Sequence, residues 1–163
     1  MAHITIEYMI ALPILIVQII LFPLTANWLM NIWVDSRRTL ALEEAASHLG
    51  STLQQMYFTL NHDSVPAGTK ITQNPGLPPF IESYHYIVSA KLRTTLDPAL
   101  NSSKILTLTA ELKGTGRNIT TTVLLGINAV WIDSLFVSNS TSAYIIAEKL
   151  PNGTIALSFG GLI

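Results

Sequence analysis

One uncharged stretch decides the fold of this chain: between Glu7 and Asp35 it reads YMIALPILIVQIILFPLTANWLMNIWV, which is residues 8–34. Its members are mostly aliphatic or aromatic. Four polar side chains interrupt it: Gln18, Thr25, Asn27 and Asn31. An α-helix needs about 20 predominantly apolar residues to cross the hydrocarbon part of a bilayer. The stretch of 27 residues is therefore long enough to span a membrane.

Two ordinary interpretations of such a segment are a cleavable secretory signal and a simple membrane anchor. A secretory signal has a basic n-region, a shorter apolar stretch and a small-residue cleavage site, and residues 1–7 and the stretch itself show none of these. We therefore expect the segment to belong to the working protein. As a plain anchor, it would tether the rest of the chain to a membrane.

The residues just ahead of the stretch give a third interpretation, because His3-Ile4-Thr5-Ile6-Glu7-Tyr8-Met9 resembles the start of archaeal class III, type IV pilin-like subunits. In that family a Gln, a Ser and a Glu recur at alternate positions just before the apolar helix. Here His3 stands for the Gln, Thr5 for the Ser and Glu7 for the Glu. The Thr keeps the hydroxyl, whereas the His departs from the family pattern.

The resemblance implies a processed subunit that assembles through its apolar helix. The family's basic leader peptide is missing ahead of His3, so either a leader was removed upstream of Met1 or a cut after Ala2 has not been made. Processing and assembly imply a prepilin peptidase and an assembly platform as partners. Glu7 would act in processing or in docking of the incoming subunit; a carboxylate in the first turn also suits the helix dipole on its own.

The apolar periodicity changes after Asp35 but does not stop. Seven apolar residues recur at spacings of three and four, which is the stripe of an amphipathic helix: Leu42, Ala45, Ala46, Leu49, Leu53, Met56 and Leu60. The sequence therefore predicts one helix from about Thr5 to about Leu60, roughly 80 Å long. Its first half is apolar on all sides and its second half is two-sided.

Pro13 and Pro23 lie inside the apolar half of this predicted helix. Each removes one backbone hydrogen bond and crowds the carbonyl four residues earlier, so each is a candidate kink. Proline is common in membrane-spanning helices, where such a kink needs no function. In a filament the same kinks would let the core helix bend.

Residues 61–80 are rich in turn and breaker residues, among them Pro66, Gly68 and Asn74-Pro75-Gly76. They predict a connecting loop, either a plain linker or a segment that wraps the domain or touches a neighbouring subunit.

From Ile81 onward the apolar period is two, with Tyr84, Tyr86, Val88, Ala90 and Leu92 on one face. The alternation recurs in the segments 106–112, 119–127, 131–137, 144–150 and 155–159. Some six strands in residues 81–163 predict a small antiparallel β-sandwich, with the immunoglobulin-like sandwich as one form. The expected fold class is α+β, with a helix over 1–60, a loop over 61–80 and an outer β-domain over 81–163.

Two observations on topology disagree. Arg37 and Arg38 follow the span, and the positive-inside rule alone would place the C-terminal part in the cytoplasm. Four Asn-x-Ser/Thr sequons indicate the opposite, since the motif has meaning only on an exported surface: Asn101, Asn118, Asn139 and Asn152. We expect the C-terminal part to lie outside the cell and to carry N-linked glycans.

The composition gives little support to nucleic-acid binding, metal binding or catalysis. Only 12% of the 163 residues are charged and the net charge is −1, so nucleic-acid binding is not expected. The chain has no cysteine, and His3, His48, His62 and His85 are dispersed without metal-ligand spacing. No phosphate-binding glycine loop, zinc-protease motif or nucleophile elbow occurs, so we expect neither an enzyme nor a cofactor.

The resemblance at residues 3–9, together with the apolar helix that follows, implies a structural subunit of an extracellular archaeal type IV pilus-like filament. Before assembly it would lie in the cytoplasmic membrane; afterwards it would form a helical homopolymer with the β-domain exposed for adhesion. The alternative is a single-pass membrane protein with an external β-domain, such as a minor pilin-like or surface-layer-binding component of a secretion or motility machine.

Overall fold

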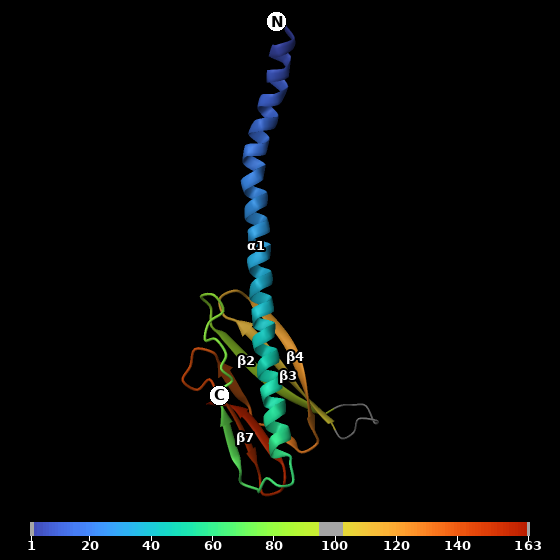
Figure 1. Ribbon diagram of the computed structural model, residues 1–163, viewed down its shortest axis with the longest axis vertical. Helices are drawn as coiled ribbons and strands as arrows, with labels where there is room; N and C mark the ends of the chain where they lie inside the picture. The colour runs from blue at the N-terminus through green and yellow to red at the C-terminus, as the bar shows by residue number, and fades with distance from the viewer. Residues whose placement is uncertain (1, 95–102, 163) are drawn as a thin grey trace. The chain divides into compact units, whose positions relative to one another are not determined.

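The computed structural model describes residues 2–94 and 103–162, except for the side chains of residues 2–8 and 162. It divides into two compact units, Met1–Arg37 and Arg38–Ile163. Helix α1, Ala2–Leu60, contributes to both units (Figure 1). The predicted long helix and its end at Leu60 are confirmed, and Pro13 and Pro23 lie inside it.

The C-terminal part of α1 packs on the strands of the second unit. The seven apolar residues of the predicted stripe are all buried there, because spacings of three and four place them on one helix face. Gly50 lies close to the strands: a Cβ atom at this position would lie 2.7 Å from Cγ2 of Val123 and 3.3 Å from Cδ1 of Leu108. The absence of a side chain at Gly50 therefore lets the helix approach the sheet.

The strands form two sheets. The four-stranded sheet has the order β1-β7-β8-β5, and the five-stranded sheet has the order β4-β3-β2-β6-β9. The first sheet contains β1 (Lys70–Gln73), β7 (Ile145–Lys149), β8 (Ile155–Phe159) and β5 (Ala129–Trp131). The second contains β4 (Arg117–Gly126), β3 (Ser103–Leu112), β2 (Tyr86–Thr94), β6 (Ser134–Val137) and β9 (Gly161–Leu162). The predicted α+β class is confirmed.

The structure differs from the predicted architecture in three details. The segment 61–80, predicted as a loop, contains β1, which pairs with β7 in the register Lys70↔Glu148 to Gln73↔Ile145. The second compact unit begins at Arg38 instead of residue 61, because the two-sided part of α1 supplies one wall of its core. Among the described strands, β5 and β8 pair in parallel, so the sheets are not wholly antiparallel.

The predicted strand 131–137 is divided between the two sheets. Residues 129–131 form β5 in one sheet and residues 134–137 form β6 in the other. Ser134 holds this crossing in place: its Oγ donates to the carbonyl of Ile132 over 2.8 Å and accepts from the backbone N–H of Phe159 over 2.9 Å. The apolar C-terminal residues are tied down next to β6, where Leu162 pairs with Ser134.

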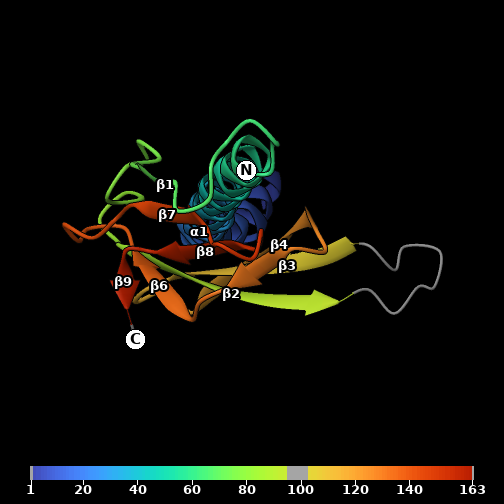
Figure 2. The same ribbon diagram turned by 90° about the horizontal axis from the view of Figure 1, so that it is seen from below.

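Helix and sheets share one hydrophobic core. All five residues of β8 are buried, which means that both faces of this strand are covered. In Figure 2, β7 and β8 lie between α1 and the strands β2 and β6. Three aromatic rings join the layers: Phe136 stacks on Tyr86 and meets Phe159 edge-on. This core holds the second unit together without disulfides, since the chain has no cysteine.

Candidate membrane and assembly interface

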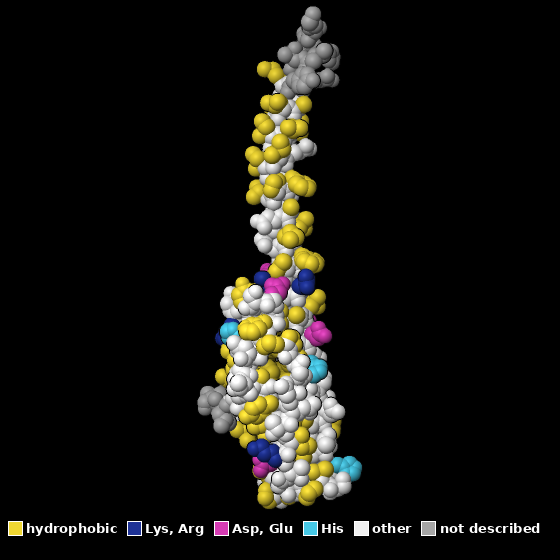
Figure 3. All heavy atoms as spheres, turned by 60° about the vertical axis from the view of Figure 1, so that its left-hand side comes forward, with side chains coloured by type: hydrophobic (Ala, Val, Ile, Leu, Met, Phe, Trp, Pro, Cys, Tyr) yellow, Lys and Arg dark blue, Asp and Glu magenta, His cyan; other side chains and the backbone are white. Residues whose placement is uncertain are grey.

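The first unit exposes an apolar surface along the whole described length of its helix (Figure 3). The exposed fraction of the large apolar side chains between Met9 and Trp33 runs from 47% at Ile32 to 77% at Met9. The helix is apolar and long enough to span a membrane: its best 18-residue window has a mean hydropathy of 2.4 and is 0% buried. Contiguous apolar surface of this extent marks a site of contact with lipid or protein.

Apolar side chains are exposed on every face of this helix, so none of its faces is buried in a core of the described protein. A helix that is apolar on all sides is stable only when lipid or other protein surrounds it. Its backbone groups are paired within the helix apart from the carbonyls opposite Pro13 and Pro23, and internal pairing is the condition for lying in hydrocarbon. The surface can therefore be covered either by a bilayer or by several neighbouring helices.

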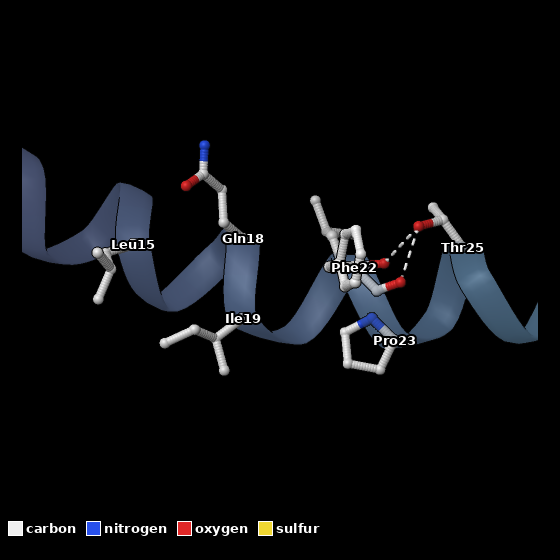
Figure 4. Close-up of a pocket in the computed structure, with 7 residues that line it drawn as sticks. Leu15, Gln18, Ile19, Phe22, Pro23 and Thr25 are labelled. Carbon is white, nitrogen blue, oxygen red and sulfur yellow. Dashed lines mark hydrogen bonds between the residues drawn. The ribbon is translucent and has the colours of Figure 1, made fainter.

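A shallow notch, open to its surroundings, lies on this surface beside Pro23 (Figure 4). Its lining residues lie between Leu15 and Thr25 and all belong to α1. Pro23 has no N–H to donate to the carbonyl of Ile19, which leaves that acceptor without its helical partner. Nearby, the hydroxyl of Thr25 donates a bifurcated hydrogen bond, shared between the carbonyls of Leu21 and Phe22, each at 3.0 Å.

Three side-chain amides stand on the same helix: Gln18, Asn27 and Asn31, all exposed. They have no hydrogen-bond partner among the residues that the structure describes. Gln18 and Thr25 are seven residues apart, so they share a face, whereas Asn27 lies nine residues from Gln18 and faces the opposite side. These amides are the polar groups that any covering of the surface must accommodate.

The C-terminal end of the apolar surface has the chemistry of a membrane boundary. Trp28 and Trp33 are both more than half exposed, and the guanidinium of Arg37 lies 4.8 Å from the ring centroid of Trp33. Tryptophan and arginine with this arrangement suit the headgroup layer, where the ring is half in hydrocarbon and the charge is in water. The adjacent Arg38 belongs to the second unit and has a different role.

Arg38 fastens α1 to the loop between β1 and β2. Its Nε donates to Oε2 of Glu82 over 2.6 Å, and its guanidinium lies 5.2 Å from the ring centroid of Tyr84. Glu82 has a φ of 56°, a left-handed conformation that non-glycine residues rarely adopt. The two arginines that the topology rule groups together are therefore used for separate purposes.

The predicted assembly residues His3, Thr5 and Glu7 lie on the backbone of α1, but their side chains are outside the described residues. Of the predicted kink positions, Pro13 and Pro23 both lie within the helix. Sequence reasoning placed no function on Gln18. The feature of the sequence that could have singled out Gln18 is a side-chain amide in the middle of an apolar run.

The three sequon asparagines that the structure describes belong to different elements of the second unit. Asn101 lies outside the described residues. Asn118 is exposed on β4, Asn139 follows β6, and Asn152 stands in the turn between β7 and β8. At the last of these, Oδ1 of Asn152 accepts from the Oγ1 and the backbone N–H of Thr154, at 2.6 and 3.1 Å. All three described acceptor side chains are accessible from solvent.

Polar groups buried in the second unit serve its packing. Burial raises the pKa of Tyr86 to about 12, and its hydroxyl donates to the carbonyl of Pro78 over 3.0 Å.

The described residues contain no group of three or more His, Asp or Glu side chains that could hold a metal ion. The exposed apolar helix of the first unit is the feature with the clearest functional chemistry. No family model matches this chain, and neither a curated protein nor a solved structure is significantly similar to it.

Proposed function

We propose that this protein is the structural subunit of an extracellular archaeal type IV pilus-like filament. The observation that carries the proposal is the helix of residues 9–33, which exposes apolar side chains on every side. The same chain provides a folded second unit with its own core. The motif of His3, Thr5 and Glu7 ahead of the helix supports the choice of family.

The physical chemistry of the helix supports self-assembly after a membrane stage. Removing one large apolar side chain from water stabilises the buried state by roughly 1.5–3 kcal/mol. Lipid provides this burial before assembly, and copies of the same helix provide it in a filament core. A prepilin peptidase and an assembly platform are the partners that such a transfer requires under the proposal.

In the proposed filament the second unit forms the outer layer. Its two sheets would be an outer β-sandwich, with an immunoglobulin-like arrangement as the finer form. The exposed Asn118, Asn139 and Asn152 would carry N-linked glycans on the cell surface. The exposed surface would serve adhesion, and the proposal assigns the chain no catalytic role, cofactor or nucleic acid.

One observation favours the alternative of a permanent membrane anchor. Trp28, Trp33 and Arg37 form a boundary of the kind that holds a single span at a fixed depth. In that case the second unit would be an external binding domain, as in a minor pilin-like or surface-layer-binding component.

Fractionation of the source cells separates the two. Filaments are sheared from the surface, and the sheared and membrane fractions are analysed by quantitative mass spectrometry of this chain. The filament proposal predicts that the chain is a major component of the sheared fraction. Recovery in the membrane fraction alone would overturn it and leave the anchor.

A further inference from the structure

Gln18 places an amide deep in the apolar part of α1. It lies 11 residues after Glu7 and 17 residues before Asp35, the two charges that bound the stretch. At a rise of 1.5 Å per residue, these separations are about 16 and 25 Å along the helix. Any placement of 20 consecutive residues of the stretch in hydrocarbon therefore includes Gln18. Asn31, in contrast, stands beside the boundary formed by Trp33 and Arg37.

The exposed amide of Gln18 has no hydrogen-bond partner among the described residues. Its neighbour on the same face, Thr25, is in contrast bonded to two carbonyls of its own helix. In Figure 4, Gln18 and Thr25 lie on one side of the ribbon and Pro23 on the other. A polar group left unpaired in an apolar medium is unfavourable, so Gln18 needs a partner from outside its helix.

We propose that the Gln18 amide is a hydrogen-bonding contact between copies of this chain, made when their apolar helices pack together. The inference rests on the proposed function. A second copy of the chain can supply the partner, because a side-chain amide carries both a donor and an acceptor and can therefore pair with another amide. Lipid tails offer neither group. Glutamine is among the side chains that hydrogen-bond across helices in membranes.

The contact also selects a face and a register. Residues at spacings of three, four and seven from Gln18 share its face, which includes Ile14, Phe22 and Thr25. Copies that pair through Gln18 would meet on this face, with the notch between Leu15 and Thr25 next to the contact. A polar group in an apolar helix interface favours those alignments of the helices that give it a hydrogen-bond partner.

The test measures self-association of the full chain in detergent micelles. The chain has no cysteine, so one exposed residue of the second unit, Gln73, is changed to cysteine for a fluorescent label. Energy transfer between donor- and acceptor-labelled chains is followed as the detergent concentration is raised. The test variant is Gln18→Leu. Its control is Thr25→Val, because the hydroxyl of Thr25 lies on the same face and is already hydrogen-bonded within its own helix.

The proposal predicts that Gln18→Leu weakens association roughly three- to thirty-fold, the range for an interhelical hydrogen bond in membranes, and that Thr25→Val changes it less than two-fold. Gln18→Asn, which keeps the amide, should retain part of the effect. Equal association of Gln18→Leu and wild type, or equal losses in both variants, would overturn the inference and leave the filament proposal standing. No association of the wild type would count against both. Unchanged near-ultraviolet circular dichroism shows that the second unit stays folded.

Discussion

The Nε atom of Arg38 donates a 2.6 Å hydrogen bond to Oε2 of Glu82, a residue whose backbone is held at a φ of 56°. The pair joins the first residue of the second unit to the loop ahead of β2. Because the ion pair is partly exposed, we expect it to contribute modestly. The left-handed backbone conformation of Glu82 should have a separate effect on the free energy of unfolding.

Substitutions at this pair separate the charge from the backbone. Arg38→Ala removes the ion pair and the contact with Tyr84, and should lower the free energy of unfolding by about 0.5–1.5 kcal/mol. Glu82→Gly should be less destabilising than Glu82→Ala, because glycine adopts a positive φ without the steric penalty of about 1 kcal/mol. Urea denaturation of the full chain in micelles, followed by near-ultraviolet circular dichroism, measures both. Equal effects of the two Glu82 variants would contradict the conformational part.

Gly50 and Val123 form a close contact between helix and sheet. Gly50→Ala adds a Cβ atom 2.7 Å from Cγ2 of Val123, so we expect it to destabilise the second unit despite the better helix propensity of alanine. Removing the opposing methyl groups should relieve the clash. In a double-mutant cycle, Gly50→Ala should therefore be less destabilising in a Val123→Ala background. Strict additivity of the two substitutions would show that the contact does not limit the approach of the helix.

Tyr57 anchors the end of α1 in a polar network. Its hydroxyl hydrogen-bonds Asn128, whose Nδ2 donates to Oδ1 of Asn61 over 2.7 Å and to the carbonyl of Gly153 over 3.2 Å. Tyr57→Phe leaves an acceptor of Asn128 unpaired and should cost about 1–3 kcal/mol of unfolding free energy. A solvent-facing control is Phe58→Leu, since Phe58 is 59% exposed. Similar stability of Tyr57→Phe and wild type in urea would show that this network does not stabilise the folded protein.

Stability at alkaline pH should report on Tyr86. Its pKa is raised by burial from 10.0 to about 12, so the folded state holds the phenol proton more tightly than the unfolded state. The resulting stabilisation is complete below pH 10 and is lost as the pH rises from about 10 to about 12. Urea midpoints measured between pH 8 and 12 should fall less steeply for Tyr86→Phe than for wild type. An identical fall in both proteins would contradict the assignment. The pKa of Tyr57 is also raised by burial, so a residual slope is expected in the variant.

Glycan occupancy is a separate expectation of an exported protein. Glycopeptide mass spectrometry of the chain from its source should find a modification on the exposed Asn152. Thr154→Ser keeps the sequon and should keep the glycan, whereas Thr154→Ala should abolish it. An unmodified Asn152 in protein taken from the cell surface would refute this part of the proposal.

Local patterns predicted the elements that depend on them. The stripe from Leu42 to Leu60 specified the buried face of α1, and the alternation from Tyr86 to Ala90 specified the inner face of β2. Non-local contacts escaped prediction. β1 has no apolar alternation and exists through its pairing with β7, and the division between β5 and β6 depends on Ser134 meeting the distant Phe159. For the candidate site, the apolar helix was predicted in full, whereas the unpaired state of the Gln18 amide became clear only from its contacts.

Under the proposed function, residues 9–33 form the core of a helical filament made of this chain. Cryo-electron microscopy of filaments sheared from the source cells tests it most directly, because side-chain density identifies both the subunit and the helix that packs at the axis. The account predicts this chain repeated helically, with residues 9–33 buried among copies of the same helix and the β-domain outside. Filaments built from a different chain, or this helix lying outside the filament core, would contradict it.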